Sequence, residues 1–186
     1  MSEIDASPEE TLQRWRDEEA AVRLRMSAPG VARPEQVAGK SGLEVFQAIF
    51  AGELPPPPIG ATLDFVPIRI EHGLAIFQGR PGRAHYNPLG IVHGGWFATL
   101  LDSCVGCAVH SALPAGRTYT TVELKINLVR ALSEQVPLVR AEGRIIHLGR
   151  SMGTAEGRLI GHDGRLYAHA TTTCFIFEAP AAKENR

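Results

Sequence analysis

A short segment near the middle of the chain contains the residue types that could do chemistry. Asn87 is followed six residues later by His93-Gly94-Gly95, and Asp102 comes nine residues after the histidine. The run from Trp96 to Leu113 is otherwise mostly apolar. A carboxylate among apolar neighbours is costly unless it is paired or used. The spacing therefore indicates Asp102 as a candidate functional group.

The two glycines suggest a second role at the start of the apolar run, which is long enough for about five turns of helix. The N-terminus of a helix presents unpaired N–H groups and a partial positive charge, and glycine lets a substrate approach the backbone. Such a place can stabilise an oxyanion. Two alternatives remain open: the glycines form only a structural turn, and Asp102 only bonds a neighbouring Thr, Ser or Arg.

Asp102 is expected about two turns into this helix. From there it reaches the N-terminus of its own helix only with difficulty. It could reach the same terminus of a second copy, if two such helices pack side by side. The positions of these residues therefore allow a site that two subunits share.

Composition limits the class of protein. The 186 residues carry a net charge of −1 and are 44% hydrophobic, which fits a soluble globular chain and gives no field that attracts nucleic acid or an anionic membrane. Met1–Glu10 is acidic and polar, unlike a secretory signal, and the odd count of three cysteines does not suit a disulfide scaffold. We therefore expect a cytoplasmic protein.

Cys104 and Cys107 have the CxxC spacing, but no second pair completes a zinc site. A redox CxxC would lie at a helix start, whereas this one lies inside the predicted helix. We interpret both as small core residues, with redox or metal chemistry as the alternative. His110, His147 and His169 are dispersed, so we expect no metal and no cofactor.

The hydrophobic pattern predicts a helical extension followed by one α+β domain. We expect an N-terminal extension over residues 1–58, a domain over 59–178 and a tail over 179–186. The expected elements are helices from Ser7 to about Met26 and over 42–51, an extended Pro55–Pro58 connector, the central helix, and strands at 62–71, 74–80, 119–132 and 138–149, with two more within 152–177 joined at Asp163-Gly164. One helix among antiparallel strands is best accommodated by a curved sheet wrapped around it.

The segment "HYNPLGIVHGGWFATLLDSCVGCAVHS" resembles the signature of the PaaI-type acyl-CoA thioesterases, which have the hotdog fold. "TTVELKINLVRAL" and "IIHLGRSMGTAEGRLIGHDGRLYAHATTTCFIF" resemble the strands that follow the helix in that family. The likeness covers about residues 60–178. It implies hydrolysis of an acyl-CoA to a free acid and coenzyme A, in a homodimer or homotetramer whose active site lies at the dimer interface.

The resemblance also implies roles for particular residues. Asp102 would act as nucleophile or general base, and the backbone N–H of Gly94 would be the oxyanion donor. Asn87 and His93 of the partner subunit would hold the thioester carbonyl or the catalytic geometry. Some relatives carry Ser or Thr four residues after the acid, and this chain departs from them because the position is Gly106. Ser103 or Thr99 would then have to orient the carboxylate.

Coenzyme A needs a groove for pantetheine and cations for its phosphates, because an arginine can pair with a phosphate through two hydrogen bonds. Solvated arginines on the strand edges are the alternative interpretation. The acyl group would meet Trp96, Phe97 and Leu100, unless these are plain core. The full set of candidate substrate-binding residues is Gly95, Trp96, Val122, Glu123, Arg130, Gly149, Arg150 and Ser151.

Two other functions stay open beside hydrolysis. Domains of this fold can bind acyl-CoA without cleaving it, and a non-catalytic acyl-CoA-binding module is the main alternative. A dehydratase is the other, although it would need a His and acid pair at a spacing that fits this chain poorly. The sequence does not identify the acyl group.

Overall fold

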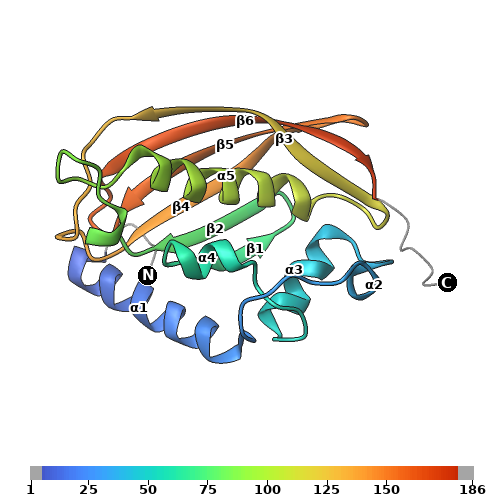
Figure 1. The fold of residues 1–186 in the computed structure, drawn as a ribbon, viewed down its shortest axis with the longest axis horizontal. Coiled ribbons are helices and arrows are strands. Elements are labelled where there is room, and N and C mark those ends of the chain that lie inside the picture. Colours follow the sequence, from blue (N-terminus) through green and yellow to red (C-terminus); the bar gives the residue numbers. More distant parts are fainter. Residues whose placement is uncertain (1–5, 180–186) are drawn as a thin grey trace.

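The computed structural model describes residues 6–179 as one curved antiparallel sheet wrapped around a long helix (Figure 1). The six strands lie in the order β1-β2-β4-β5-β6-β3. They are β1 (Phe65–Glu71), β2 (Leu74–Gly79), β3 (Arg117–Leu128), β4 (Val139–Leu148), β5 (Met152–Gly161) and β6 (Leu166–Glu178). The helices are α1 (Pro8–Arg25), α2 (Pro34–Val37), α3 (Gly42–Phe50), α4 (Pro58–Thr62) and the central α5 (Gly94–Ser111), with a short 3₁₀ turn at Arg83–His85.

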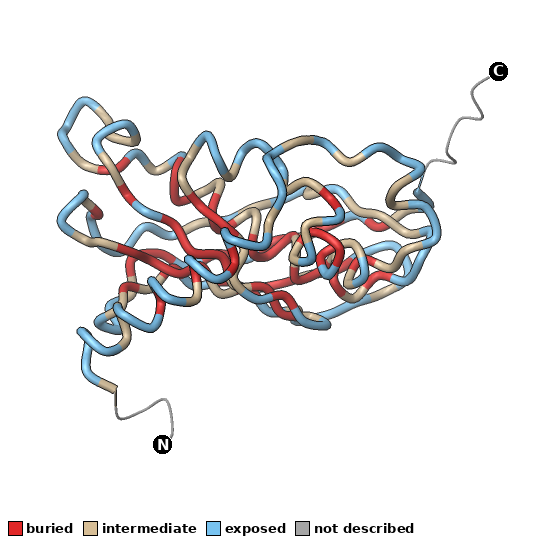
Figure 2. The backbone as a smooth tube through the Cα atoms, turned by 90° about the horizontal axis from the view of Figure 1, so that it is seen from below, coloured by how far each residue is buried: buried red, intermediate tan, exposed pale blue. Residues whose placement is uncertain are grey.

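The central helix α5 lies directly against the concave face of the sheet. Leu100, Leu101 and Val105 are fully buried there. Gly143 of β4 allows this contact, because a Cβ at that position would lie 2.6 Å from the carbonyl oxygen of Cys104. Figure 2 shows that the buried segments gather in the middle of the molecule, whereas most of α1 and the loops are exposed. The packing thus fixes which face of α5 stays away from the sheet.

The architecture predicted from the sequence is confirmed. The two tight turns expected at Gly73 and Gly164 both have φ of +76°, a backbone conformation that glycine adopts without strain. Antiparallel pairing joins β1 to β2, β2 to β4, β4 to β5, β5 to β6 and β6 to β3. The two edges of the sheet are therefore β1 and β3.

Several predicted boundaries were wrong by a few residues. The first strand begins at Phe65 and not at 62, because residues 58–62 form α4, with Pro58 in its first turn. The extended Pro55–Pro58 connector accordingly ends at Pro57. Strand β3 ends at Leu128 and not at 132, because the next two N–H groups both turn to the carbonyl of Tyr167. The four-residue helix α2 was not predicted.

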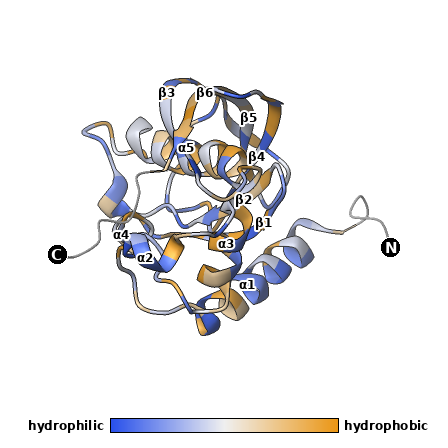
Figure 3. Ribbon diagram, turned by 90° about the vertical axis from the view of Figure 1, so that its right-hand side faces the viewer, coloured by the Kyte–Doolittle hydropathy of each residue, from blue (hydrophilic) through white to orange (hydrophobic). Residues whose placement is uncertain are grey.

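The extension passes around the β1 edge and contacts both faces of the sheet (Figure 3). On the convex face, Gln78 of β2 donates to the carbonyl of Trp15 at 3.1 Å and to the carboxylate of Glu19 at 2.7 Å, which holds α1 in place. On the concave side, the N–H of Gly42 at the start of α3 donates to the carbonyl of Leu113 at 3.0 Å. The elements before β1 therefore frame the domain. Of the predicted tail, residues 180–186 lie outside the described residues.

Candidate active site

The start of α5 presents an unused hydrogen-bond donor. His93 is the N-cap, with φ −64° and ψ 139°, and its Nδ1 accepts the N–H of Gly95 at 2.8 Å. Within residues 6–179, the N–H of Gly94 has no acceptor. An N–H at the positive end of an eighteen-residue helix is suited to bind a carbonyl oxygen that gains negative charge.

Asn87 lies in the loop in front of this helix terminus. Its Oδ1 accepts the N–H of Leu89 at 2.9 Å and that of Ile91 at 3.4 Å, and its own N–H donates to the carbonyl of Ile91 at 2.8 Å. These bonds close the loop on itself, and the N–H of His93 ties the loop to the carbonyl of His85 at 2.8 Å. The structure thus brings Asn87, His93 and Gly94 to the same end of α5.

Asp102 lies further along the helix. It is half-buried, and its carboxylate accepts a hydrogen bond from Oγ1 of Thr121 on β3 at 3.1 Å. Eight residues separate it from Gly94, which corresponds to about 12 Å along a helix axis. The carboxylate and the free N–H are therefore too far apart to act on one carbonyl group within a single chain.

The hydroxyl that orients Asp102 was missed by the sequence analysis. Thr99 and Ser103 were expected to fill that role, but their hydroxyls donate to backbone carbonyls of their own helix, at 3.0 Å and 2.7 Å. Thr121 takes it instead. Its place nineteen residues away on an edge strand gave no local signal, and only the pairing of β3 over α5 reveals it.

The structure also gives a physical reason for Gly106. A Cβ at this position would lie 2.8 Å from the hydroxyl oxygen of Tyr119 and 3.1 Å from its Cε2. The tyrosine ring therefore occupies the space that a Ser or Thr side chain would need. In this chain the hydroxyl that bonds the carboxylate comes from Thr121 of β3 and not from the helix.

A cavity of about 360 Å³ opens beside Asp102. Besides Asp102, α5 contributes Ser103 and Cys107, and β3 contributes Tyr119. Burial raises the pKa of Tyr119 well above its usual value, and it raises the pKa of Cys107 to about 12. Both groups are therefore neutral hydrogen-bond donors at physiological pH, and they line the same cavity as the carboxylate of Asp102.

The CxxC cysteines belong to the interior of α5, as expected. Cys104 is fully buried, and burial raises the pKa of its thiol well above the usual value. A thiol with a raised pKa is a poor nucleophile and a poor metal ligand at neutral pH, because both roles need the thiolate. No group of three or more metal-binding side chains was found within residues 6–179.

The three candidate acyl-contacting residues lie in the core, as the alternative interpretation of them held. Trp96 is 3% exposed, its indole N–H donates to the carbonyl of Leu63 at 2.8 Å, and its ring stacks on His85 with centroids 5.5 Å apart. Phe97 and Leu100 are buried in the same core. Other residues line the cavity beside Asp102. Contact of these three with a substrate stays a prediction.

The predicted coenzyme-binding residues lie in the middle of β3 and beyond each of its ends. Val122 is 60% exposed and is followed by Glu123 at a bulge in the strand. Arg130 is exposed just after the end of β3. The Gly149-Arg150-Ser151 turn lies at the other end, where Arg117 donates to the carbonyl of Arg150 at 2.6 Å. At about 3.3 Å per residue, Arg130 and the Gly149-Arg150-Ser151 turn are separated by roughly 40 Å along β3.

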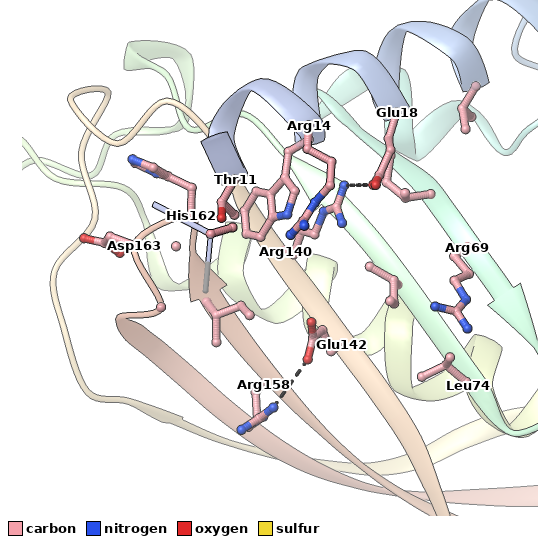
Figure 4. Close-up of a pocket in the computed structure, with 18 of the residues that line it drawn as sticks. Thr11, Arg14, Glu18, Arg69, Leu74, Arg140, Glu142, Arg158, His162 and Asp163 are labelled. Carbon is pink, nitrogen blue, oxygen red and sulfur yellow. Dashed lines mark hydrogen bonds and ion pairs between the residues drawn. The ribbon is translucent and has the colours of Figure 1, made fainter. Parts of the chain in front are cut away.

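A larger hollow lies elsewhere in the molecule. A groove of about 930 Å³ lies between α1 and the convex face of the sheet (Figure 4). Arg140 there pairs with Glu18 and lies over the ring of Trp15, and Arg158 pairs with Glu142 at 3.4 Å. Arg140 therefore fixes α1 to the sheet, Arg158 links β5 to β4, and Asp102 does not line the groove. The chemistry therefore favours the smaller cavity.

Within the described part of the chain, no helix has both the length and the apolar character that a membrane span requires. The central helix meets the length but carries Asp102 and several other polar residues.

Comparison with known proteins identifies the family of the chain. The thioesterase superfamily is the family whose model matches, over residues 89–168, a range that includes His93, Gly94 and Asp102. A comparison with functionally curated proteins gives no match.

Solved structures share the fold. The phenylacetic acid degradation-related protein of Ralstonia eutropha JMP134 is 30% identical, with a TM-score of 0.64, covering 70% of this chain and 98% of its own. A thioesterase family protein of Silicibacter pomeroyi is 25% identical, with a TM-score of 0.61, covering 66% of this chain and 90% of its own. A protein of Streptococcus mutans UA159, crystallised with acetyl-CoA, is 24% identical, with a TM-score of 0.56, covering 61% of this chain and 89% of its own. Together they confirm the hotdog fold.

Proposed function

The chain belongs to the thioesterase superfamily, and from this premise we propose that it hydrolyses acyl-CoA thioesters to a free acid and coenzyme A. One observation carries the proposal. A half-buried carboxylate, Asp102, borders an apolar cavity on a helix whose own N-terminus holds a free N–H. These are the two groups that cleavage of a thioester requires: one to attack or to activate water, and one to stabilise the oxyanion.

Two copies of the chain would complete the site. Strand β3 is an edge strand of twelve residues, and its exposed apolar side chains include Val122 and Leu128. Such an edge is open to pairing with another strand. We infer that two β3 strands pair about a two-fold axis, which makes one continuous sheet and places the two α5 helices side by side.

The sequence of α5 suits this arrangement. Gly95, Ala98 and Thr99 are small and only partly covered, so that another helix can approach closely. In an antiparallel pair that crosses near Ala98, Asp102 lies opposite Gly94 of the partner subunit, because the two residues are four positions to either side of the crossing point. The 12 Å separation within one chain then becomes a direct approach between chains.

The reaction follows from these positions. The thioester carbonyl oxygen accepts the N–H of Gly94 of the partner subunit, and Asn87 and His93 of the partner subunit hold that loop and terminus in place. Asp102 attacks the carbonyl carbon or takes a proton from an attacking water. The carbon–sulfur bond breaks, and the thiolate of coenzyme A leaves and is protonated. When water is the attacking group, the free acid is released at this point. When Asp102 attacks, an acyl–aspartate anhydride forms first, and water then hydrolyses it to the free acid and the Asp102 carboxylate. Thr121 fixes the carboxylate through its hydrogen bond.

Antiparallel pairing of two β3 strands would also bring two candidate phosphate-binding residues, Arg130 and Arg150 of different chains, close together. Arg130 follows the end of one β3, next to the start of the partner's β3 and therefore near Arg150 of the partner subunit. Two arginines from different chains would then receive the phosphates of one coenzyme A. The acetyl-CoA in the Streptococcus mutans structure supports a coenzyme A ester as the ligand.

The test is release of coenzyme A from a panel of acyl-CoA esters, by wild type and by Asp102→Asn. We expect hydrolysis by wild type and a loss of at least about 100-fold in kcat for the folded variant. No turnover of any ester by a folded dimer would overturn the proposal in favour of a binding module. Hydration of an enoyl-CoA without hydrolysis would identify a dehydratase, and turnover that survives in Asp102→Asn would exclude the role of this carboxylate.

A further inference from the structure

The N-terminal extension, counted up to the start of β1 so that it includes all of α4, forms most of the cavity beside Asp102. Eleven of its nineteen lining residues precede β1. They come from the end of α1 and the segment after it, from α3, and from residues 56–61, most of which belong to α4. Strands β1 and β2 supply four more, and α5 and β3 supply the side that holds the carboxylate. An element that the chemistry does not use therefore encloses the space next to the reacting group.

The enclosing wall is apolar. Phe46 and Ile49 of α3 face the cavity together with Phe65 and Phe77 of the sheet. The one cation on the wall, Arg23, is already paired with Glu19 at 2.7 Å and with Asp64 at 3.1 Å. The cavity therefore suits an uncharged hydrocarbon group, attached to a carbonyl that lies at the carboxylate.

Several contacts hold the wall in a fixed position. Phe46 packs edge-on against His110 of α5, with ring centroids 5.2 Å apart. The N–H of Gly30 donates to the carbonyl of Pro56 at 2.9 Å, and the hydroxyl of Ser27 donates to the carbonyl of Leu54 at 3.2 Å. Proline fixes φ along Pro55–Pro58, which stiffens the last segment. A wall held in this way limits the size of the group that it admits.

The volume sets that limit. At roughly 30 Å³ for each water-sized group, a cavity of about 360 Å³ takes about a dozen non-hydrogen atoms. Octanoyl and decanoyl groups fall within this limit, and so does an acyl group that ends in a single ring. A hexadecanoyl group exceeds it, and an acetyl group leaves most of the apolar wall without contact.

We propose that the N-terminal extension is the acyl-selecting wall of the active site, and that it restricts the enzyme to apolar acyl groups of up to about a dozen non-hydrogen atoms. The inference rests on the proposed function, because it takes Asp102 as the group that meets the thioester. It gives the extension a role in substrate choice, beside its contacts with the sheet.

Two substitutions change the wall in opposite directions. Ala61 is exposed and lines the cavity, so Ala61→Phe should fold and fill part of the space. Ile59 is 45% exposed and also lines it, so Ile59→Ala should enlarge the space at little cost in stability. Ala51→Phe is the matched control, since Ala51 is an exposed residue of the extension that does not line the cavity.

The measurement is kcat/KM over straight-chain acyl-CoA esters from acetyl to hexadecanoyl, with full-length chain throughout. We expect a wild-type maximum near octanoyl or decanoyl and a fall of at least about tenfold by hexadecanoyl. Ala61→Phe should lower the ratio of octanoyl to acetyl kcat/KM at least about tenfold, Ile59→Ala should move the maximum to longer chains, and Ala51→Phe should keep the wild-type profile. A wild-type profile without a ceiling, or one that Ala61→Phe leaves unchanged, would overturn the inference.

A second readout separates this inference from the proposed function. If wild type hydrolyses no ester, hydrolysis is refuted, and calorimetric binding of octanoyl-CoA and acetyl-CoA then tests the wall directly. Tighter binding of octanoyl-CoA that Ala61→Phe removes would support the wall as an acyl-binding surface. Equal binding of both esters, or a preference that Ala61→Phe does not alter, would reject it.

Discussion

The proposed role of Gly94 as oxyanion donor can be tested by removing one hydrogen-bond donor, its N–H, from the backbone. Gly94 is the first residue of α5, a position where proline fits a helix without loss of an internal hydrogen bond. The preceding His93 has φ −64° and ψ 139°, which is the conformation that a residue before proline prefers. Gly94→Pro should therefore keep the helix and delete the N–H that has no acceptor among the described residues.

The expected magnitude follows from the chemistry of oxyanion sites. Loss of one such donor costs about 100-fold to 1,000-fold in kcat, or about 2.7–4 kcal/mol of transition-state stabilisation. The new Cβ would lie 3.1 Å from Cδ1 of Leu128, the end of a flexible side chain that can move aside. Gly94→Ala introduces the same Cβ and retains the N–H, so it isolates the steric effect from the loss of the donor.

The assay is coenzyme A release at saturating ester for both variants, with the urea midpoint as the measure of folding. We predict that kcat of Gly94→Pro lies at least about 100-fold below that of Gly94→Ala, while the two urea midpoints are similar. Values of kcat for the two variants within about threefold of each other, with both folded, would refute the assignment of the Gly94 N–H as oxyanion donor.

Three further predictions follow from contacts of the same site. Thr121→Val should lower kcat about tenfold, because one hydrogen bond to a carboxylate contributes about 1.5 kcal/mol. Thr171→Val, at an exposed position of β6, is the control and should leave kcat unchanged. Equal effects of the two substitutions on kcat would contradict the role of Thr121. Gly106→Ser should destabilise the fold by about 1–3 kcal/mol in urea, because its Cβ meets Tyr119, and Tyr119→Phe should recover part of that loss; a neutral Gly106→Ser would contradict the packing. Burial raises the pKa of the Cys107 thiol from about 9 in the unfolded chain to about 12 in the folded chain, so the free energy of unfolding should fall as pH rises above 9. Cys107→Ala should make the urea midpoint depend less steeply on pH in this range. An unchanged slope would contradict the burial of the thiol.

The sheet and the central helix were predictable because their sequence patterns are local. Strands β5 and β6 alternate buried and exposed residues, and Gly164 marks the turn between them. The central helix follows a turn and carries apolar residues all along it. The short helices α2 and α4 were missed because they have only four and five residues. At α4 the run of four prolines also suggested an extended chain.

The parts of the site that were missed depend on contacts between distant segments. Thr121 meets Asp102 only because β3 folds back over α5, and the ring of Tyr119 explains Gly106 for the same reason. The extension carries no residue with an obvious chemical role, so its sequence gave no sign that Phe46 and Pro56 would enclose the cavity. Sequence spacing indicated the candidate carboxylate, Asp102, whereas the residues that surround it became known only from the fold.

Mixing subunits tests the central claim most directly, namely that Asp102 acts on a thioester bound at the partner's helix terminus. Asp102→Asn and Gly94→Pro chains are each expected to be nearly inactive alone. A mixed dimer has one site with both groups intact, so an equal mixture that exchanges subunits should recover about a quarter of wild-type activity if two-fold dimers form at random. A mixture that stays as inactive as its two components, with subunit exchange demonstrated, would contradict the shared site.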